Sequence, residues 1–304
     1  MPSFCRFPYM IKWFNNTLTK SFKAHSLLIH STLTRNMSYG SKAADRLAGK
    51  TALITGASSG IGQATAIELA SAAGGNIKLV LTSRRVEKLE QLKKDIESKF
   101  PNAKVLPLPF DLSKYHDVPA FVAGIPAEFA KVDILVNNAG LVLGNEKIGT
   151  IAQADIDTMF NTNVLGLIAL TQAFVPKFRA QDSGDIVNVG SIAGRDPYQG
   201  GAIYCPTKAA LNSFTHVLRK ETIDSRIRVI EVQPGQVETE FSVVRNRGDK
   251  AKADAVYAGV EPLTADDVAE IIVFALTRRQ NTVVAETLLF PSHQGAAQML
   301  HRKN

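Results

Sequence analysis

The chain has 304 residues, of which 45% are hydrophobic and 21% are charged, as in an ordinary globular protein and unlike a disordered or fibrous one. Its two cysteines, Cys5 and Cys205, are too few and too widely spaced for a disulfide scaffold or a cysteine-ligated metal site, and we expect no metal. No run of eighteen uninterrupted apolar residues occurs, so we also expect no integral membrane segment.

The positive charge is concentrated at the N-terminus. The formal net charge is +7, and residues 1–44 contain six basic residues and no acidic one. The rest of the chain has 29 basic and 28 acidic residues, a balance that gives no reason to expect a nucleic-acid partner. We therefore divide the chain into a basic N-terminal extension, 1–44, and one domain, 45–304.

The extension permits two interpretations. An acid-free N-terminus with apolar residues on one helical face and lysines on the other is typical of a mitochondrial transit peptide. Alternatively, Met37 begins the recognisable protein, and residues 1–36 are an upstream extension that is disordered or not always translated. The first interpretation predicts a mitochondrial protein; the second predicts a cytoplasmic one, with the nucleus as a further location.

From residue 51 onward, short apolar segments alternate with longer segments of helical periodicity. We predict strands at 51–55, 77–83, 104–109, 133–137, 185–190, 227–232 and 287–290, and helices at 61–73, 86–100, 115–130, 153–180, 202–224 and 264–279. A helix follows almost every strand, and the strands are nearly continuously apolar, as in a sheet covered on both faces. The sequence therefore predicts a single α/β domain of the Rossmann type, a doubly wound parallel sheet of about seven strands.

Two prolines mark the third predicted strand. Pro107 and Pro109 have no N–H to donate to a neighbouring strand, which a sheet tolerates at its edge rather than at its centre. The Rossmann strand order 3-2-1-4-5-6 places the third strand at an edge, in agreement with this constraint.

A glycine-rich loop follows the first strand and opens the first helix. Gly56 permits a tight turn, Gly60 lets the backbone approach a pyrophosphate, and Gly62 allows the helix to pack closely on the strand. The amides and the dipole at a helix N-terminus favour phosphates. We therefore predict a dinucleotide-binding loop whose contact residues are Gly56, Ser58, Ser59, Gly60, Ile61 and Gly62.

The end of the second strand indicates which dinucleotide binds. NAD sites place an acidic residue there for the ribose 2′-hydroxyl, but this chain has Arg84 and Arg85. Two guanidinium groups favour the 2′-phosphate of NADP, whereas the alternative, a solvated arginine pair, places cations where a helix N-terminus favours acids. Asp111, after the third strand, is a candidate acceptor for the adenine amino group and also a typical turn residue, and the two roles are compatible.

Tyr204 and Lys208 are four residues apart at the start of a predicted helix, so their side chains share one face. A neighbouring ammonium group stabilises a phenolate, and we expect it to lower the pKa of Tyr204 from its usual value of about 10. Ser191 follows the fifth strand, at the carboxyl edge where open α/β sheets keep their chemistry.

Together these motifs resemble the short-chain dehydrogenases/reductases over about residues 48–295. The resemblance rests on Thr55-Gly56-x-x-x-Gly60-x-Gly62, Asn137-Asn138-Ala139-Gly140, Ser191 and Tyr204-x-x-x-Lys208, in this order. It implies that Tyr204 is the general acid/base, that Lys208 lowers its pKa and holds the nicotinamide ribose, that Ser191 orients the substrate oxygen and that Asn163 anchors a proton-relay water. It also implies cofactor contacts at Asn138, Ala139, Gly140, Tyr204, Lys208, Pro234, Gly235, Val237 and Thr239.

Residues 240–249 and 290–292 further resemble the fungal and bacterial NADP-dependent 3-hydroxy acid dehydrogenases, in which the first segment lies over the active site. A hydroxy or amino acid substrate needs a cationic partner for its carboxylate. Arg245 is our first candidate and Arg195 our second, although each is equally well explained as a surface arginine on a loop.

The resemblance implies an enzyme, a homotetramer, that transfers hydride from C3 of a short 3-hydroxy acid such as L-serine or L-allo-threonine to NADP. Two alternatives stay open. One is an NADPH-dependent reductase of other carbonyl compounds, such as 3-oxoacyl thioesters, sugars or diketones. The other is a non-catalytic dinucleotide sensor, which the intact set of Asn163, Ser191, Tyr204 and Lys208 disfavours.

Overall fold

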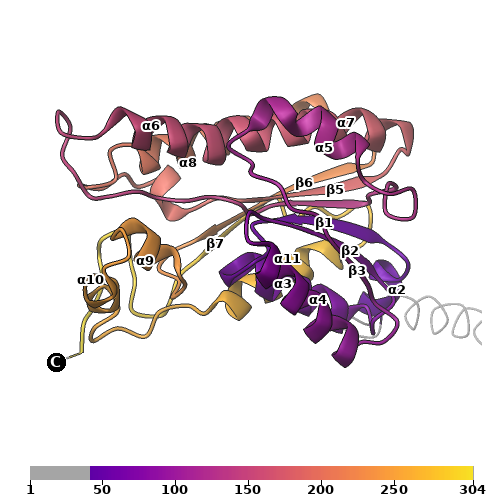
Figure 1. Cartoon of the computed structure of the whole chain (residues 1–304), viewed down its shortest axis with the longest axis horizontal. Coiled ribbons are helices and arrows are strands. Elements are labelled where there is room, and N and C mark those ends of the chain that lie inside the picture. The colour runs from indigo at the N-terminus through magenta and orange to yellow at the C-terminus, as the bar shows by residue number, and fades with distance from the viewer. Residues whose placement is uncertain (1–41, 304) are drawn as a thin grey trace, which may run out of the picture. The chain divides into compact units, whose positions relative to one another are not determined.

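Seven parallel strands form one sheet in the order β3-β2-β1-β4-β5-β6-β7 (Figure 1). The computed structural model describes residues 42–303, so the predictions for the N-terminal extension lie almost entirely outside the described residues. The strands are β1 (Thr51–Thr55), β2 (Lys78–Thr82), β3 (Lys104–Pro107), β4 (Ile134–Asn137), β5 (Gly184–Val189), β6 (Ile227–Pro234) and β7 (Glu286–Leu289). The predicted Rossmann fold is confirmed, including the edge position of β3.

Helices cover both faces of this sheet (Figure 1). One layer contains α3 (Gly60–Ala72), α4 (Val86–Lys99) and α11 (Ala265–Leu276), with the short α2 (Ala43–Leu47) beside it. The other contains α5 (Val118–Ala123), α6 (Gln153–Phe160), α7 (Leu167–Ala180) and α8 (Tyr204–Glu221). Successive side chains of a strand point to opposite faces, so each strand contributes to two cores.

Strand β1 shows why the sequences of the strands are almost continuously apolar. All five of its residues are buried. Ala52 and Ile54 pack in the core beneath α3 and α11, whereas Leu53 packs in the core beneath α7. A strand buried on both faces has no solvent side on which polar residues would alternate.

Several predicted helices differ in the structure. The helix predicted at 115–130 is a 3₁₀ turn, η1 (Tyr115–Asp117), followed by α5, which ends at Ala123 with Gly124 as its C-cap. Pro126, two residues further, cannot continue a helix. The helix predicted at 153–180 contains a π-helical segment, η2 (Asn161–Gly166), between α6 and α7. The short helices α2, α9 (Phe241–Arg245) and α10 (Lys250–Ala255) were not predicted.

Among the described residues, one helical segment, Gln153–Ala180, is long and apolar enough to cross a membrane. Half of its most apolar window is buried inside the fold, and Phe174 and Phe178 are fully buried against the sheet. Its apolar composition is therefore explained by packing on the sheet, as in the core helix of a globular α/β protein.

Candidate active site

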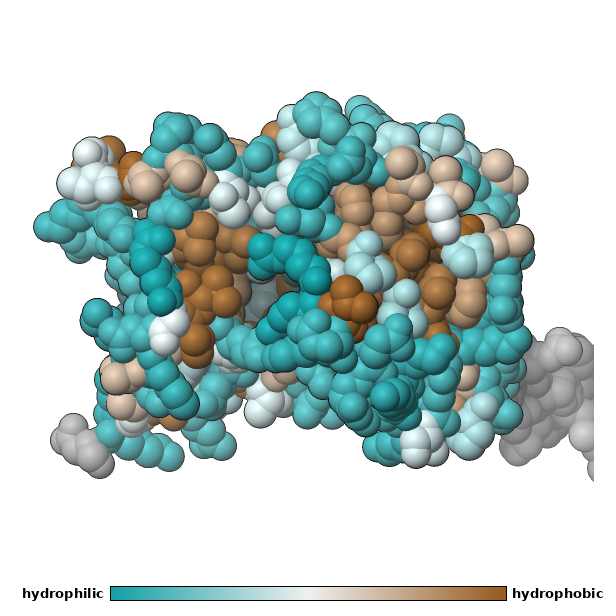
Figure 2. Space-filling model, in the orientation of Figure 1, coloured by the Kyte–Doolittle hydropathy of each residue, from teal (hydrophilic) through white to brown (hydrophobic). Residues whose placement is uncertain are grey.

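A cavity of about 360 Å³ lies at the carboxyl ends of the central strands. Apolar side chains gather in a hollow between α8 and α9, with hydrophilic residues around it (Figure 2). Most of the predicted site residues line the cavity: Gly56, Ser58, Ser59, Gly60, Ile61, Arg84, Arg85, Asp111, Asn138, Ala139, Gly140, Ser191, Tyr204, Pro234, Gly235, Val237 and Thr239. Gly62, Asn163, Lys208, Arg195 and Arg245 are not part of its lining.

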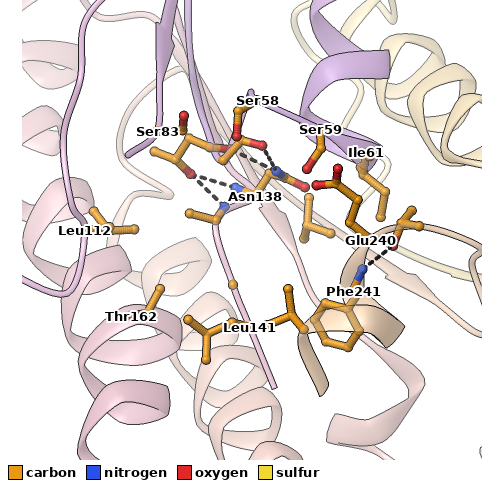
Figure 3. Close-up of a pocket in the computed structure, with 18 of the residues that line it drawn as sticks. Ser58, Ser59, Ile61, Ser83, Leu112, Asn138, Leu141, Thr162, Glu240 and Phe241 are labelled. Carbon is orange, nitrogen blue, oxygen red and sulfur yellow. Dashed lines mark hydrogen bonds between the residues drawn. The ribbon is translucent and has the colours of Figure 1, made fainter. Parts of the chain in front are cut away.

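The glycine-rich loop is shaped by contacts with the end of β4 (Figure 3). The Asn138 side chain donates hydrogen bonds to the carbonyls of Thr55 and Gly56 at 2.9 and 3.3 Å, and the hydroxyl of Thr55 accepts from the amide of Asn138 at 2.9 Å. Gly56 and Gly60 have φ values of +66° and +55°, which only glycine adopts readily. A Cβ at Gly62 would lie 2.5 Å from the carbonyl oxygen of Gly56, so the close approach of helix to loop requires this glycine.

At the arginine-lined end of the cavity, Arg85 is held by the glycine-rich loop. Its guanidinium donates to the hydroxyl of Ser58 at 2.9 and 3.1 Å and to that of Ser59 at 2.6 Å. It also donates to the carboxylate of Glu240 at 2.7 Å. Arg84 is exposed and lines the same end. Sequence reasoning missed Glu240, because this residue reaches Arg85 from a loop 155 positions along the chain.

Asp111 also lines the cavity and organises the turn that follows β3. One of its carboxylate oxygens accepts from the amide and the hydroxyl of Ser113, at 3.1 and 2.8 Å. Asp111 therefore stabilises the turn, as predicted, and also lines the cavity.

Tyr204 and Ser191 meet at the opposite end of the cavity. Tyr204 begins α8 and is buried, and its ring lies edge-on to Phe241 with 5.5 Å between centroids. Ser191 follows β5, and its hydroxyl accepts from the amide of Ala193 at 3.1 Å. Phe241 lines the cavity (Figure 3) and belongs to α9, so the unpredicted helix supplies the ring that packs against the tyrosine.

Lys208 and Asn163 lie directly behind the cavity wall. The ammonium of Lys208 donates to the carbonyl of Val189 at 2.8 Å and lies 5.9 Å from the centre of the Tyr204 ring. Asn163 lies in the π-helical segment, where its side chain exchanges hydrogen bonds of 2.8 and 2.9 Å with the backbone of Leu141. The structure therefore brings the four predicted catalytic side chains to one place.

The expectation that the pKa of Tyr204 lies below its usual value is contradicted by the structure. Burial raises the pKa of Tyr204, because a phenolate loses its hydration there, and Tyr198 acts in the same direction. A hydrogen bond with Ser191 and the charge of Arg245 act against this rise. Burial also lowers the pKa of Lys208, to about 8. Burial is the largest cause of the pKa shift of each group.

The two candidate substrate arginines lie in different surroundings. Arg245 stands on α9, and its guanidinium donates to Asn145 at 2.6 Å, to the hydroxyl of Tyr198 at 3.0 Å and to the carbonyl of Gly200 at 2.9 Å. Arg195 instead forms an ion pair with Glu286 on β7, away from the cavity. Neither arginine lines the cavity, and the ion pair of Arg195 with Glu286 favours Arg245, which contacts Tyr198, as the candidate.

Among residues 42–303, no group of three or more His, Cys, Asp or Glu side chains is arranged to hold a metal ion. The polar groups that line the cavity are hydroxyls, amides, the guanidinium groups of Arg84 and Arg85 and the carboxylates of Asp111 and Glu240.

The family model described as short chain dehydrogenase matches residues 50–250. The chain belongs to this family. It is 56% identical over 258 residues to the NADP-dependent 3-hydroxy acid dehydrogenase of Schizosaccharomyces pombe, covering 85% of this chain and 98% of the relative. It is 37% identical over 247 residues to the serine 3-dehydrogenase of Agrobacterium fabrum, covering 81% and 96%.

Solved structures of short-chain dehydrogenases resemble the fold closely. The closed form of serine dehydrogenase complexed with NADP⁺ superimposes with a TM-score of 0.76 at 34% identity, covering 83% of this chain and all of that chain. The glycine-rich loop and the N-terminus of α3 line the cavity, and the amides of a helix N-terminus in this position fit the phosphates of a dinucleotide.

Proposed function

We propose that this dehydrogenase oxidises the 3-hydroxyl of short 3-hydroxy acids, such as L-serine and L-allo-threonine, with NADP as cofactor. The observation that carries the proposal is the convergence of Ser191, Tyr204, Lys208 and Asn163 at one end of a cavity whose other end is cationic. The likeness to a 3-hydroxy acid dehydrogenase and to serine dehydrogenases supports this choice of substrate.

Each catalytic side chain has a role that its position supports. In the proposed step the Tyr204 phenolate accepts the proton of the substrate hydroxyl and becomes the neutral tyrosine, and Ser191, which hydrogen-bonds to Tyr204, orients the same substrate oxygen. Lys208, which is buried and fixed to Val189, stabilises the phenolate and holds a ribose hydroxyl. Asn163 anchors the relay that returns the proton to solvent. When bound, NADP⁺ supplies the hydride acceptor.

A panel of substrates tests the proposal. Purified enzyme is assayed with NADP and three classes of substrate: L-serine and L-allo-threonine, 3-hydroxy acids that lack the amino group, and neutral alcohols. We expect the acids to have the highest kcat/KM. Activity confined to neutral alcohols or ketones would favour a general carbonyl reductase, and no turnover with any class would favour a dinucleotide sensor.

We propose that Arg245 binds the substrate carboxylate. Its three hydrogen bonds leave further N–H groups of the guanidinium to donate, and its charge already acts on Tyr204. Arg245→Ala is expected to lower the ratio of kcat/KM for an acid to that for a neutral analogue by about tenfold. Arg195→Ala is the matched control, because that arginine is paired with Glu286. Equal ratios in wild type and both variants would contradict the assignment.

The cationic end of the cavity is proposed to select NADP through Arg84 and Arg85. Arg84→Ala is expected to raise the dissociation constant of NADPH by about tenfold and that of NADH by less than about twofold, because only NADPH carries the 2′-phosphate. Titration of the nicotinamide fluorescence measures both dissociation constants. An equal loss for the two cofactors would assign Arg84 a general structural role.

A homotetramer is proposed as the functional assembly. The long helical segments carry exposed apolar side chains, Leu165 in η2 and Val217 in α8, which subunit contacts would cover. We expect light scattering at micromolar concentration to give the mass of four chains, and a monomer mass would refute the proposal.

The proposed location is the cytoplasm, and fractionation of cells that express the protein with and without residues 1–36 tests a mitochondrial role for the extension.

A further inference from the structure

We propose that Glu240 is a specificity-determining residue that competes with the 2′-phosphate of the cofactor for Arg85. This inference rests on the proposed 2′-phosphate site and adds an internal competitor to it. Glu240 immediately precedes α9 and reaches across the mouth of the cavity to the start of α4.

The contacts of Glu240 are those of an anion held by two cations. One carboxylate oxygen accepts from the guanidinium of Arg85 at 2.7 Å, and the other accepts from the ammonium of Lys88 at 2.7 Å. Hydrogen bonds from Lys88 and Arg85 lower the pKa of Glu240 to about 2. The carboxylate therefore stays ionised throughout the physiological pH range, and the competition is not a pH switch.

The place of this ion pair overlaps the expected place of the phosphate. Arg85 simultaneously donates to Ser58 and Ser59 of the glycine-rich loop, and Glu240 lies beside Ser59 and Ile61 (Figure 3). The side chains of Arg85, Lys88 and Glu240 are 39%, 43% and 47% exposed, so an entering ligand can reach all three. A dianionic phosphate bound at Arg85 would lie next to a carboxylate, and like charges at such distances repel.

The same carboxylate is compatible with a cofactor that has a free ribose 2′-hydroxyl. NADH lacks the 2′-phosphate, so the pair between Glu240 and Arg85 persists when it binds. Arg84 and Arg85 make the affinity for NADPH higher than that for NADH, and Glu240 makes this difference in affinity smaller.

Displacement of Glu240 would also act on the substrate end of the site. Phe241, the next residue, packs against Tyr204, and Arg245 lies one turn further along α9. Release of the carboxylate from Arg85 and Lys88 removes the two ion pairs that tie the start of this helix to the cofactor half of the fold. Binding of the 2′-phosphate is thereby coupled to the segment that carries the proposed substrate arginine.

The test is a comparison of cofactor binding by Glu240→Gln and Glu238→Gln, measured by fluorescence titration without substrate. Glu238 is the matched control, because it is exposed in the same loop, does not line the cavity and loses the same charge on substitution. Glu240→Gln is expected to lower the dissociation constant of NADPH by about threefold to tenfold and to change that of NADH by less than about twofold. The increase in NADPH affinity should become smaller at high salt, because salt screens the interaction between exposed charges.

Two further variants separate the possible failures. In an Arg85→Ala background, Glu240→Gln is expected to have no effect on NADPH, because the shared cation is gone. If wild type prefers NADPH and Glu240→Gln binds it no more tightly than Glu238→Gln does, the competition is refuted while the 2′-phosphate site stands. Weaker NADPH binding by Glu240→Gln would also refute it. If wild type and Arg84→Ala do not distinguish NADPH from NADH, the proposed site itself fails.

Discussion

Replacement of Tyr204 by phenylalanine is expected to lower kcat by about 10²- to 10⁴-fold, because it removes the one hydroxyl placed to exchange a proton with the substrate. The ring stays, so its edge-on packing against Phe241 and the shape of the cavity are retained. Binding of NADPH should therefore change by less than about threefold. The measurements are kcat with saturating L-serine and NADP, and a fluorescence titration with NADPH.

Tyr198→Phe is the control for this substitution. Tyr198 lies close enough to raise the pKa of Tyr204, and its hydroxyl accepts from Arg245 at 3.0 Å, but it does not line the cavity. Its variant loses the same atom in the same region, and we expect kcat to fall by less than about tenfold. Turnover of Tyr204→Phe above a tenth of wild type would remove the tyrosine from the proposed proton transfer.

The layout of the sheet was predictable from the sequence because local rules decide it. Strands such as β1, buried on both faces, are recognisable as short apolar runs, and the missing N–H of Pro107 restricts β3 to an edge. The carboxyl ends of parallel strands meet at one edge of a sheet, so Gly56, Arg84 and Ser191 could be assigned to one cavity before their positions were known.

The sequence did not predict features that depend on contacts between distant segments. The helix α9 has only five residues, too few for a periodic pattern, and its place over Tyr204 depends on packing of Phe241. No local signal distinguishes Arg195 from Arg245, since the difference between them is a glutamate on β7. The end of β2 was interpreted as lacking a carboxylate, and Glu240 supplies one from another loop.

The second large effect is expected from Asp185→Asn, which should destabilise the fold without touching the site. Asp185 is the second residue of β5 and lies opposite Arg228 on β6, and the two side chains are 1% and 2% exposed. The guanidinium donates to both carboxylate oxygens, at 2.6 and 2.8 Å, and also to the carbonyl of Leu276 at the end of α11, at 2.8 Å. Loss of the carboxylate charge leaves a buried cation without its counter-ion, which costs about 3–5 kcal/mol.

Urea unfolding without cofactor measures this effect as a lower midpoint with an unchanged slope. Asp224→Asn is the matched control, because it breaks the exposed pair with Arg179 and should leave the urea midpoint nearly unchanged. In the folded fraction, kcat with L-serine should equal that of wild type, since neither Asp185 nor Arg228 lines the cavity. Equal destabilisation by the two aspartate variants would contradict the role of the buried pair.

The double variant Asp185→Leu/Arg228→Met separates the cost of an unpaired charge from the value of the pair itself. Removing both charges also removes two desolvation costs, so this protein should recover most of the stability that Asp185→Asn loses. Lys50, 3.4 Å from Asp185 and only a quarter exposed, would lose a partner but can still reach water. Full recovery would show that the pair aligns β5, β6 and α11 without net stabilisation, whereas no recovery would mean that its hydrogen bonds stabilise the fold directly.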